Sequence, residues 1–272
     1  MSTLKKYIST QTDVKNIDHY DDSFVNNIIE QRTAALKLKD IDTYSNFLIN
    51  SKAEQLFFLK ALNNNYSKFY RNPFTFYSIE NLLFPVFVGQ LLNKNKKEIR
   101  VWSAASSAGQ EAYSLAILFE EYQMKSAEMF SYRIFATDKC SEEIIKAKAG
   151  MYKELEILQM SFARIKKWFS KKGDNYFIDP NLQKNIHFSV FDLLNKSTHS
   201  PGSSIYGDFD LIICANILFY YKPMYQMMII EKLVGNLSKG GYLVVSEIER
   251  HLLLENNYKE IYPQSGIFQP KY

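Results

Sequence analysis

The chain has 272 residues, 46% hydrophobic and 15% aromatic, enough to bury the core of one large domain or of two smaller ones. Its 33 basic and 29 acidic residues nearly cancel, which excludes the strongly basic surface of a protein that coats nucleic acid. Two cysteines without metal-ligand spacing exclude a disulfide framework, and no uncharged apolar stretch is long enough to span a bilayer, so we expect a cytoplasmic protein without membrane insertion.

The N-terminal third of the chain predicts an all-helical unit, which we place at residues 1–85. Residues 1–20 are polar and show no clear period, so we expect them to be loosely ordered. After Ser23, the expected helix cap, apolar residues recur at helical spacing, and short amphipathic helices follow as far as residue 62.

A polar loop follows these helices. Asparagines at positions 63–65 end the last helix, and Phe69, Tyr70 and Arg71 precede Pro73. In one interpretation, the two aromatic side chains anchor a surface connection and Arg71 is solvated. The motifs described below favour a functional loop instead.

Residues 100–119 predict a strand, a turn of small residues and a helix. The turn, at residues 104–109, lies at the carboxyl end of the strand, where α/β sheets bind ligands. On its own, this turn is equally compatible with a helix start that merely is rich in Ala and Ser. It contains neither the Lys-Ser/Thr pair of a phosphate loop nor a full G-x-G-x-x-G, so nothing evident binds a di- or triphosphate.

A second buried strand is predicted at residues 132–138, and it ends in Asp138. The two oxygens of a carboxylate at this place match the spacing of the two ribose hydroxyls of a nucleoside. The alternative role is that of a helix cap, but Ser141 suits that role better and leaves Asp138 free.

A small inserted subdomain is expected at about residues 153–190. Residues 154–172 look helical and basic, and residues 175–180 with 186–190 resemble a strand pair. His187 alternates with apolar neighbours there and is interpreted as a structural residue.

The most hydrophobic strand is predicted at residues 209–218 and should lie at the centre of the sheet. A helix at 224–237, a turn at 238–241, a buried strand at 242–247 and a closing hairpin complete the chain. Under parallel pairing, the turn at 104–109, Asp138, Asp192 and Asn216 share one edge of the sheet. The polar groups at that edge favour a nucleoside without phosphates, such as S-adenosylmethionine.

Five segments in order resemble the motif series of CheR-type chemotaxis receptor methyltransferases: NYSKFYR at 65–71, VWSAASSAGQEAYS at 101–114, ATD at 136–138, AGMY at 149–152 and NILFY at 216–220. The resemblance runs from about Phe24 to the end of the chain. It implies a Rossmann-like class I methyltransferase domain of the α/β class at residues 86–272, with the helical N-terminal domain and the inserted subdomain.

The resemblance also implies the reaction. A methyl group passes from S-adenosylmethionine to glutamate side chains in the cytoplasmic helices of chemoreceptors, which gives methyl esters and S-adenosylhomocysteine. We expect the enzyme to be a monomer that binds no nucleic acid.

The roles of individual residues follow from the same resemblance. Asn65, Ser67 and Arg71 would reach the methionine part of the cofactor and the catalytic centre, with Tyr220 near the methyl group. The residues that would line the rest of the cofactor site are Ala104, Gly109 and Gln110 in the turn, Asp138 at the ribose, and Asp192, Leu193, Asn216 and Ile217 on the adenine side.

The chain departs from the family pattern at several positions. Gln110 stands where the family usually has the first glutamate of Gly-Glu-Glu, so a carboxylate expected near the amino group of the cofactor is replaced by a neutral amide. Ala215 and Asp192 also replace the usual Arg and the frequent Asn. Two alternatives to the receptor methyltransferase therefore stay open: an inactive relative that binds cofactor or product as a sensor or scaffold, and a methyltransferase for another substrate.

Overall fold

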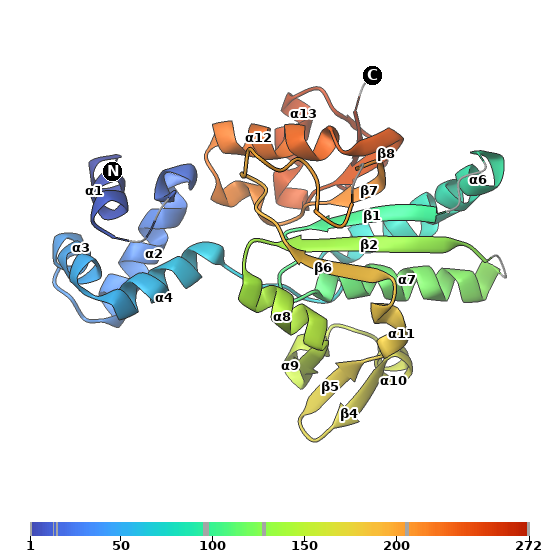
Figure 1. The fold of residues 1–272 in the computed structure, drawn as a ribbon, viewed down its shortest axis with the longest axis horizontal. Helices are drawn as coiled ribbons and strands as arrows, with labels where there is room; N and C mark the ends of the chain where they lie inside the picture. Colours follow the sequence, from blue (N-terminus) through green and yellow to red (C-terminus); the bar gives the residue numbers. More distant parts are fainter. Residues whose placement is uncertain are drawn as a thin grey trace. The chain divides into compact units, whose positions relative to one another are not determined.

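The computed structural model describes residues 2–12, 14, 16–94, 98–126, 129–204 and 207–270 (Figure 1). The chain forms two compact units: Met1–Asn65 together with Ile217–Met228, and Tyr66–Asn216 together with Ile229–Tyr272. Residues 66–85, expected in the helical domain, therefore belong to the second unit, and a short segment from the C-terminal half belongs to the first.

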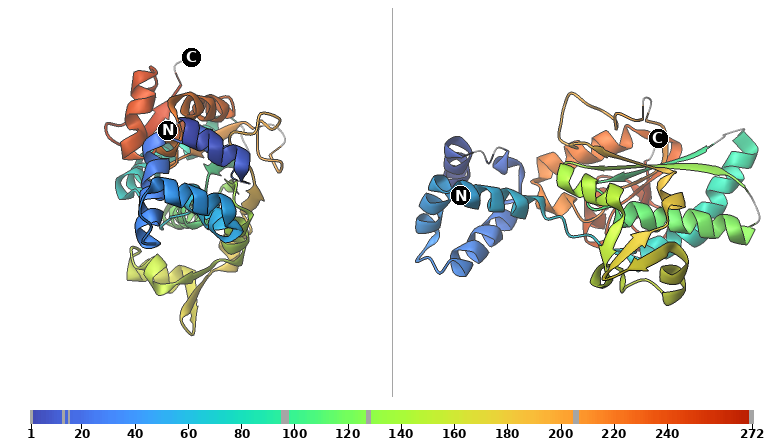
Figure 2. Two further views of the ribbon diagram at one scale, coloured as in Figure 1. Left: turned by 90° about the vertical axis from the view of Figure 1, so that its left-hand side faces the viewer. Right: turned by 60° about the horizontal axis from the view of Figure 1, so that its bottom comes forward.

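The first unit is helical (Figure 2). Its described elements are α1 (Ser2–Gln11), η1 (Ile17–His19), α2 (Asp22–Ala35), α3 (Ile41–Asn50), α4 (Lys52–Asn63), η3 (Leu218–Tyr220) and the first part of α12 (Pro223–Val234). The expectation of a loose segment at residues 1–20 is wrong for α1, whose Ile8 is fully buried. Residues 1, 13 and 15 of that segment lie outside the described residues.

Side-chain caps set the starts of these helices. Asp21, not Ser23, caps α2: its Oδ1 accepts a hydrogen bond from the backbone N–H of Ser23 at 2.9 Å. The prediction of a Ser23 cap was wrong because both residue types cap helices and the sequence offers them two positions apart. Asn64 ends α4 in the left-handed conformation, with φ 31°, which confirms the predicted asparagine stop.

The second unit is built on a seven-stranded sheet of described residues in the order β6-β2-β1-β7-β8-β10-β9. The strands are β1 (Glu98–Ala104), β2 (Ser131–Asp138), β6 (Ile186–Val190), β7 (Phe209–Ile213), β8 (Leu237–Val244), β9 (Lys259–Glu260) and β10 (Ile267–Gln269). The first five pair in parallel, and β10 pairs antiparallel with β8 and β9. The central position of β7 and the C-terminal hairpin confirm two predictions. The predicted turn at 238–241 is wrong, because β8 begins at Leu237, the last residue of the predicted helix, and runs through those residues.

Alternate side chains of the central strands face different layers. Ile99 and Val101 join a core with residues of α5 (Pro73–Ser78), the π-helical η2 (Ile79–Leu83), α6 (Phe84–Lys94) and α7 (Gln110–Ser126). Trp102 instead packs edge-on against Phe191, at a ring distance of 5.5 Å. Phe191 opens the long loop between β6 and β7.

The inserted segment forms its own three-stranded antiparallel sheet in the order β3-β5-β4 (Figure 1). Its elements are β3 (Met151–Lys153), α9 (Glu154–Ile157), α10 (Phe162–Trp168), β4 (Phe169–Lys172), β5 (Asn175–Ile178) and α11 (Pro180–Gln183), after α8 (Ser141–Ala149). The predicted pairing of 175–180 with 186–190 was wrong: β6 pairs in parallel with β2 in the large sheet. The chain ends with η4 (Glu247–Glu249), α13 (Arg250–Glu255) and the hairpin of β9 and β10.

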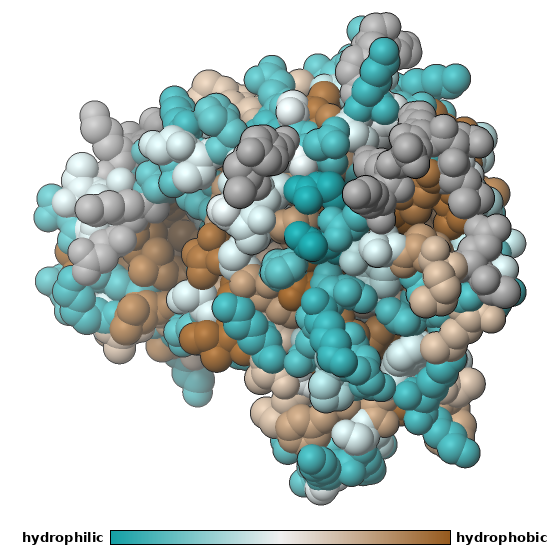
Figure 3. Space-filling model, turned by 45° about the vertical axis from the view of Figure 1, so that its right-hand side comes forward, coloured by the Kyte–Doolittle hydropathy of each residue, from teal (hydrophilic) through white to brown (hydrophobic). Residues whose placement is uncertain are grey.

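Hydrophilic and hydrophobic residues are interspersed on the face drawn in Figure 3. None of the helices in the described ranges has the length and hydropathy needed to cross a bilayer. Both cysteines are free thiols, Cys214 buried and Cys140 half-buried.

Candidate functional site

The turn after β1 is held in an unusual backbone conformation. Ala105, Ser107 and Gly109 have positive φ values of 60°, 49° and 88°. Such conformations are costly for residues with a Cβ atom and persist where the surroundings impose them, often at ligand sites. The N–H of Ser106 bonds the carbonyl of Thr137 at 2.8 Å, which fixes the turn against the end of β2.

Asp138 lies directly beside this turn. Its Oδ2 accepts a hydrogen bond from the N–H of Ser107 at 2.9 Å, and its Oδ1 accepts one from the N–H of Cys140 at 2.8 Å. The side chain is 7% exposed, and burial raises the pKa of its carboxyl. The sequence predicted that Asp138 is free, but in the structure it also caps the turn before α8. Each of its carboxylate oxygens still has a lone pair for a second donor.

Gly109 is required by the fold itself. A Cβ atom there would lie 3.0 Å from Cβ of Ala147 and 3.1 Å from Cε1 of Phe188. The glycine thus lets α8 and β6 pack closely against the turn, in addition to its positive φ.

Two buried polar atoms, one in the turn and one in the first residue of α7, indicate a ligand. Gln110 is 3% exposed and its Oε1 has no hydrogen-bond partner among the described residues, and the same holds for Oγ of Ser106. Buried polar groups without a partner are rare and costly in native structures. With the carboxylate of Asp138, they fit a ligand that offers hydroxyl and amino donors, as S-adenosylmethionine does.

Glu111 is a candidate that sequence reasoning missed. Its Oε1 accepts a hydrogen bond from Oγ of Ser103 at 2.6 Å. Burial raises the pKa of its carboxyl to about 7, against the attraction of Arg71, with a further upward contribution from Glu249. The sequence could have indicated Glu111 by its position: it follows Gln110 in the first turn of α7, which lies near the ends of the strands.

A second missed residue, Glu249, holds the end of β7. Its Oε2 accepts hydrogen bonds from the N–H of Asn216 at 2.9 Å, from the N–H of Ser246 at 3.0 Å and from Oγ of Ser246. Glu249 is fully buried, and Asn216 has a positive φ of 64°. No sequence motif marks Glu249, because the contact joins η4 to a strand end 33 residues earlier.

The loop that carries Ser67 and Arg71 is tied to the same sheet edge. The N–H of Tyr70 bonds Oγ of Ser114 in α7 at 3.1 Å, and Nδ2 of Asn72 lies 3.4 Å from Oδ1 of Asn216. Arg71 is half-buried, and its Nη1 bonds the carbonyl of Tyr66 at 2.7 Å.

Asp192 and Leu193 follow β6 next to Asp138, because the N–H of Phe191 bonds the carbonyl of Asp138 at 3.0 Å. Leu193 is buried, whereas Asp192 is exposed and accepts a hydrogen bond from the N–H of Leu194 at 2.9 Å. Ala104, at the end of β1, is also buried.

The other three predicted site residues, Asn65, Ile217 and Tyr220, belong to the first unit. There, the hydroxyl of Tyr220 accepts a hydrogen bond from Nδ2 of Asn64, and its ring lies 4.5 Å from that of Phe24. The second unit thus brings together the turn, Asp138, Asp192, Leu193, Asn216 and the loop with Ser67 and Arg71.

The chemistry of this edge is that of a polar organic ligand. Within the described ranges, no group of three or more His, Cys, Asp or Glu side chains is arranged to hold a metal ion. Hydrogen-bond acceptors dominate, with one arginine at the side.

A family model and several curated relatives of this chain all describe chemotaxis methyltransferases. Residues 65–265 match the family model described as "CheR methyltransferase, SAM binding domain". The chemotaxis protein methyltransferase of Listeria innocua is 32% identical over 77% of this chain and 76% of its own length. That of Borreliella burgdorferi is 28% identical over 82% and 79%, and that of Vibrio anguillarum 30% identical over 76% and 72%.

Proposed function

Because this chain belongs to the CheR methyltransferase family, we propose that it methylates glutamate side chains in the cytoplasmic helices of chemoreceptors. S-adenosylmethionine is the cofactor, and the second unit is a Rossmann-like α/β domain of the class I methyltransferases. The match over residues 65–265 is the observation that carries the proposal, and the acceptor-rich edge beside Asp138 supports it.

The reaction needs alignment more than acid or base catalysis. S-adenosylmethionine, when bound, supplies a methyl group on a positively charged sulfur, and a glutamate is already ionised at neutral pH. The task of the protein is to hold the attacking carboxylate in line and to exclude water. Arg71 is suited to hold one oxygen of the substrate carboxylate while the other attacks, since a guanidinium binds carboxylates in a fixed geometry.

The cofactor contacts are proposed from the family resemblance, and the chemistry of Asp138, Gln110 and Glu111 supports three of them. Asp138 accepts the two ribose hydroxyls, and Glu111 with Oε1 of Gln110 faces the amino group. Asn65 and Ser67 lie along the methionine part, and Tyr220 lies near the transferred methyl group. Ala104 and Gly109 leave room for the cofactor, and the adenine side is framed by Asp192, Leu193, Asn216 and Ile217.

Two measurements test this proposal. Transfer of labelled methyl groups to receptor-containing membranes, with base-labile release as methanol, is expected from the protein. Calorimetric titration with S-adenosylhomocysteine is expected to show binding. Binding without transfer would favour the inactive sensor or scaffold, transfer to another acceptor would favour the third alternative, and binding of neither cofactor nor product would contradict all three.

Asp138→Asn is expected to weaken binding of S-adenosylhomocysteine by about tenfold or more. The amide loses the charge and one of the two acceptors, while its size stays the same. Calorimetry measures the loss, and Asp174→Asn, an exposed position in the turn between β4 and β5, is the matched control. Equal affinity of the Asp138 and Asp174 variants would contradict the ribose role.

Glu111 predicts a pH dependence of product binding. The folded pKa of its carboxyl is about 7, so the ionised form that attracts an ammonium group is populated only as the pH rises through that value. We expect affinity for S-adenosylhomocysteine to increase between about pH 6 and pH 8, and Glu111→Gln to remove this dependence. Titrations at several pH values check this; a profile shared by both proteins would assign the effect to another group.

The same raised pKa has a consequence for the free protein. Because the folded pKa lies above the ordinary glutamate value of 4.5, the contribution of Glu111 to stability is complete below pH 4.5 and is lost as the pH rises through about 7. A bound ammonium group would oppose this loss.

A further inference from the structure

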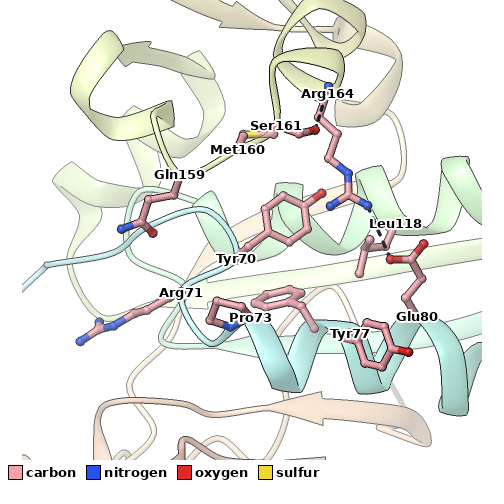
Figure 4. A pocket seen from close by; sticks show the side chains of 11 residues that line it. Tyr70, Arg71, Pro73, Tyr77, Glu80, Leu118, Gln159, Met160, Ser161 and Arg164 are labelled. Carbon is pink, nitrogen blue, oxygen red and sulfur yellow. Dashed lines mark hydrogen bonds and ion pairs between the residues drawn. The ribbon is translucent and has the colours of Figure 1, made fainter.

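A second pocket lies in the same unit, on the opposite side of the loop from the guanidinium of Arg71 (Figure 4). Its volume is about 550 Å³, within the range of ligand pockets. It is bounded by Tyr70, Arg71 and Pro73, by α5 and η2, by Leu118 of α7, and by residues 159–164. None of the cofactor contacts proposed above explains it.

Tyr70 places an unsatisfied donor in this pocket. The residue is 8% exposed, has a positive φ of 51°, and its hydroxyl has no hydrogen-bond partner among the described residues. Burial raises the pKa of the hydroxyl, so the group keeps its proton and can donate. A phenylalanine would fill the same space without an unpaired buried hydroxyl, so the geometry calls for an acceptor from outside the chain.

Arg164 supplies a second donor beside the first. Its guanidinium lies 4.7 Å from the centre of the Tyr70 ring. Glu121 binds its Nε at 3.0 Å and its Nη2 at 2.7 Å, and Glu80 lies 3.5 Å from Nη2. These contacts leave Nη1 without a partner among the described residues.

The charges around Arg164 select the kind of acceptor. Glu80 also pairs with Lys125 at 2.8 Å, so two carboxylates face two cations. A further carboxylate would meet no net positive charge from these four groups and would approach both acids. A neutral carbonyl oxygen can accept from Tyr70 and Arg164 without that repulsion.

The rim of the pocket indicates a protein as the source of this carbonyl. Tyr77 is 60% exposed and lines the pocket, and Leu158 and Phe162, 60% and 78% exposed, flank its lining residues in the chain. Exposed apolar side chains around a pocket are typical of protein–protein sites. Arg71, which lines the pocket, is also the residue proposed to hold the substrate glutamate.

We propose that this pocket binds the side-chain amide of an Asn or Gln in the protein substrate, on the segment that flanks the methyl-accepting glutamate. The inference rests on the proposed function for the identity of the substrate. It assigns the pocket a role in substrate specificity, separate from cofactor binding.

The test compares Tyr70→Phe with Tyr258→Phe, which removes a hydroxyl from a residue of the same unit that does not line the pocket. Tyr70→Phe is expected to raise KM for receptor-containing membranes by about tenfold, with kcat and the affinity for S-adenosylhomocysteine within about twofold of the original protein. Tyr258→Phe is expected to leave KM unchanged. Gln159→Trp, at an exposed position that lines the pocket, is expected to raise KM by obstruction.

Cosedimentation with receptor-containing and receptor-free membranes measures the same contact without methyl transfer, so failure of the proposed reaction leaves the pocket testable. We expect weaker receptor-dependent sedimentation of Tyr70→Phe and Gln159→Trp. Unchanged KM and sedimentation in both variants would overturn the inference. Loss of S-adenosylhomocysteine affinity in parallel with the rise in KM would also overturn it, because Tyr70 would then act by supporting the Arg71 loop.

Discussion

Arg71→Ala is expected to lower methyl transfer to receptor glutamates by about 100-fold or more, with the fold intact. The guanidinium aligns the attacking carboxylate in the proposed mechanism, and misplacement by about 1 Å costs that much in oriented reactions. Among the described residues, the guanidinium of Arg71 donates a hydrogen bond only to the carbonyl of Tyr66, at 2.7 Å. It lies 5.1 Å from the centre of the Tyr66 ring. Its removal breaks no side-chain ion pair among the described residues, but it withdraws the attraction that lowers the pKa of the Glu111 carboxyl.

Three variants separate alignment from charge. Arg71→Lys keeps the charge but not the fork of donors, so we expect activity between those of the original protein and Arg71→Ala. Arg133→Ala, which removes a surface ion pair with Glu98 at 3.2 Å, is the control and is expected to retain full activity. Steady-state transfer rates and thermal unfolding are measured together; unchanged turnover in Arg71→Ala would remove Arg71 from the mechanism.

The sequence predicts the parts of the fold that depend on local pattern. The apolar run of β7 indicates a strand buried on both faces, and the structure places it at the centre of the sheet. Alternation in residues 186–190 indicates a strand equally well, but it carries no information about the partner. In the structure this strand, β6, pairs in parallel with β2 and not with β5, and so it extends the large sheet beside Asp138.

The candidate site also contains residues that the sequence predicts and residues that only the structure reveals. Asp138 and the turn after β1 are detectable because each follows a strand and has a distinctive composition. Glu111 and Glu249 are not, because their roles arise from contacts with Ser103 and Asn216 that only the folded chain creates. Gln110, one of the residues that depart from the family pattern, is a candidate because it is buried and its side-chain oxygen has no partner among the described residues.

Glu249→Ala is expected to lower both the stability of the protein and its affinity for S-adenosylhomocysteine. One carboxylate oxygen accepts from the N–H of Asn216 at 2.9 Å and from two donors of Ser246, so the alanine leaves three donors to find other partners. Unpaired buried donors cost roughly 1–3 kcal/mol each, and partial rehydration reduces the sum, so we expect a loss of about 2–4 kcal/mol in the free energy of unfolding.

The effect on affinity tests whether Glu249 positions Asn216. Without the carboxylate, the positive φ of 64° at Asn216 loses the bond that supports it, and we expect affinity for S-adenosylhomocysteine to fall by about tenfold. Glu249→Gln retains one acceptor and should fall between the alanine variant and the original protein, whereas Glu255→Ala, at the exposed end of α13, should change neither quantity. Urea unfolding and calorimetry measure the two effects. A loss of stability with unchanged affinity would restrict Glu249 to the fold, because the end of β7 would then hold its conformation without it.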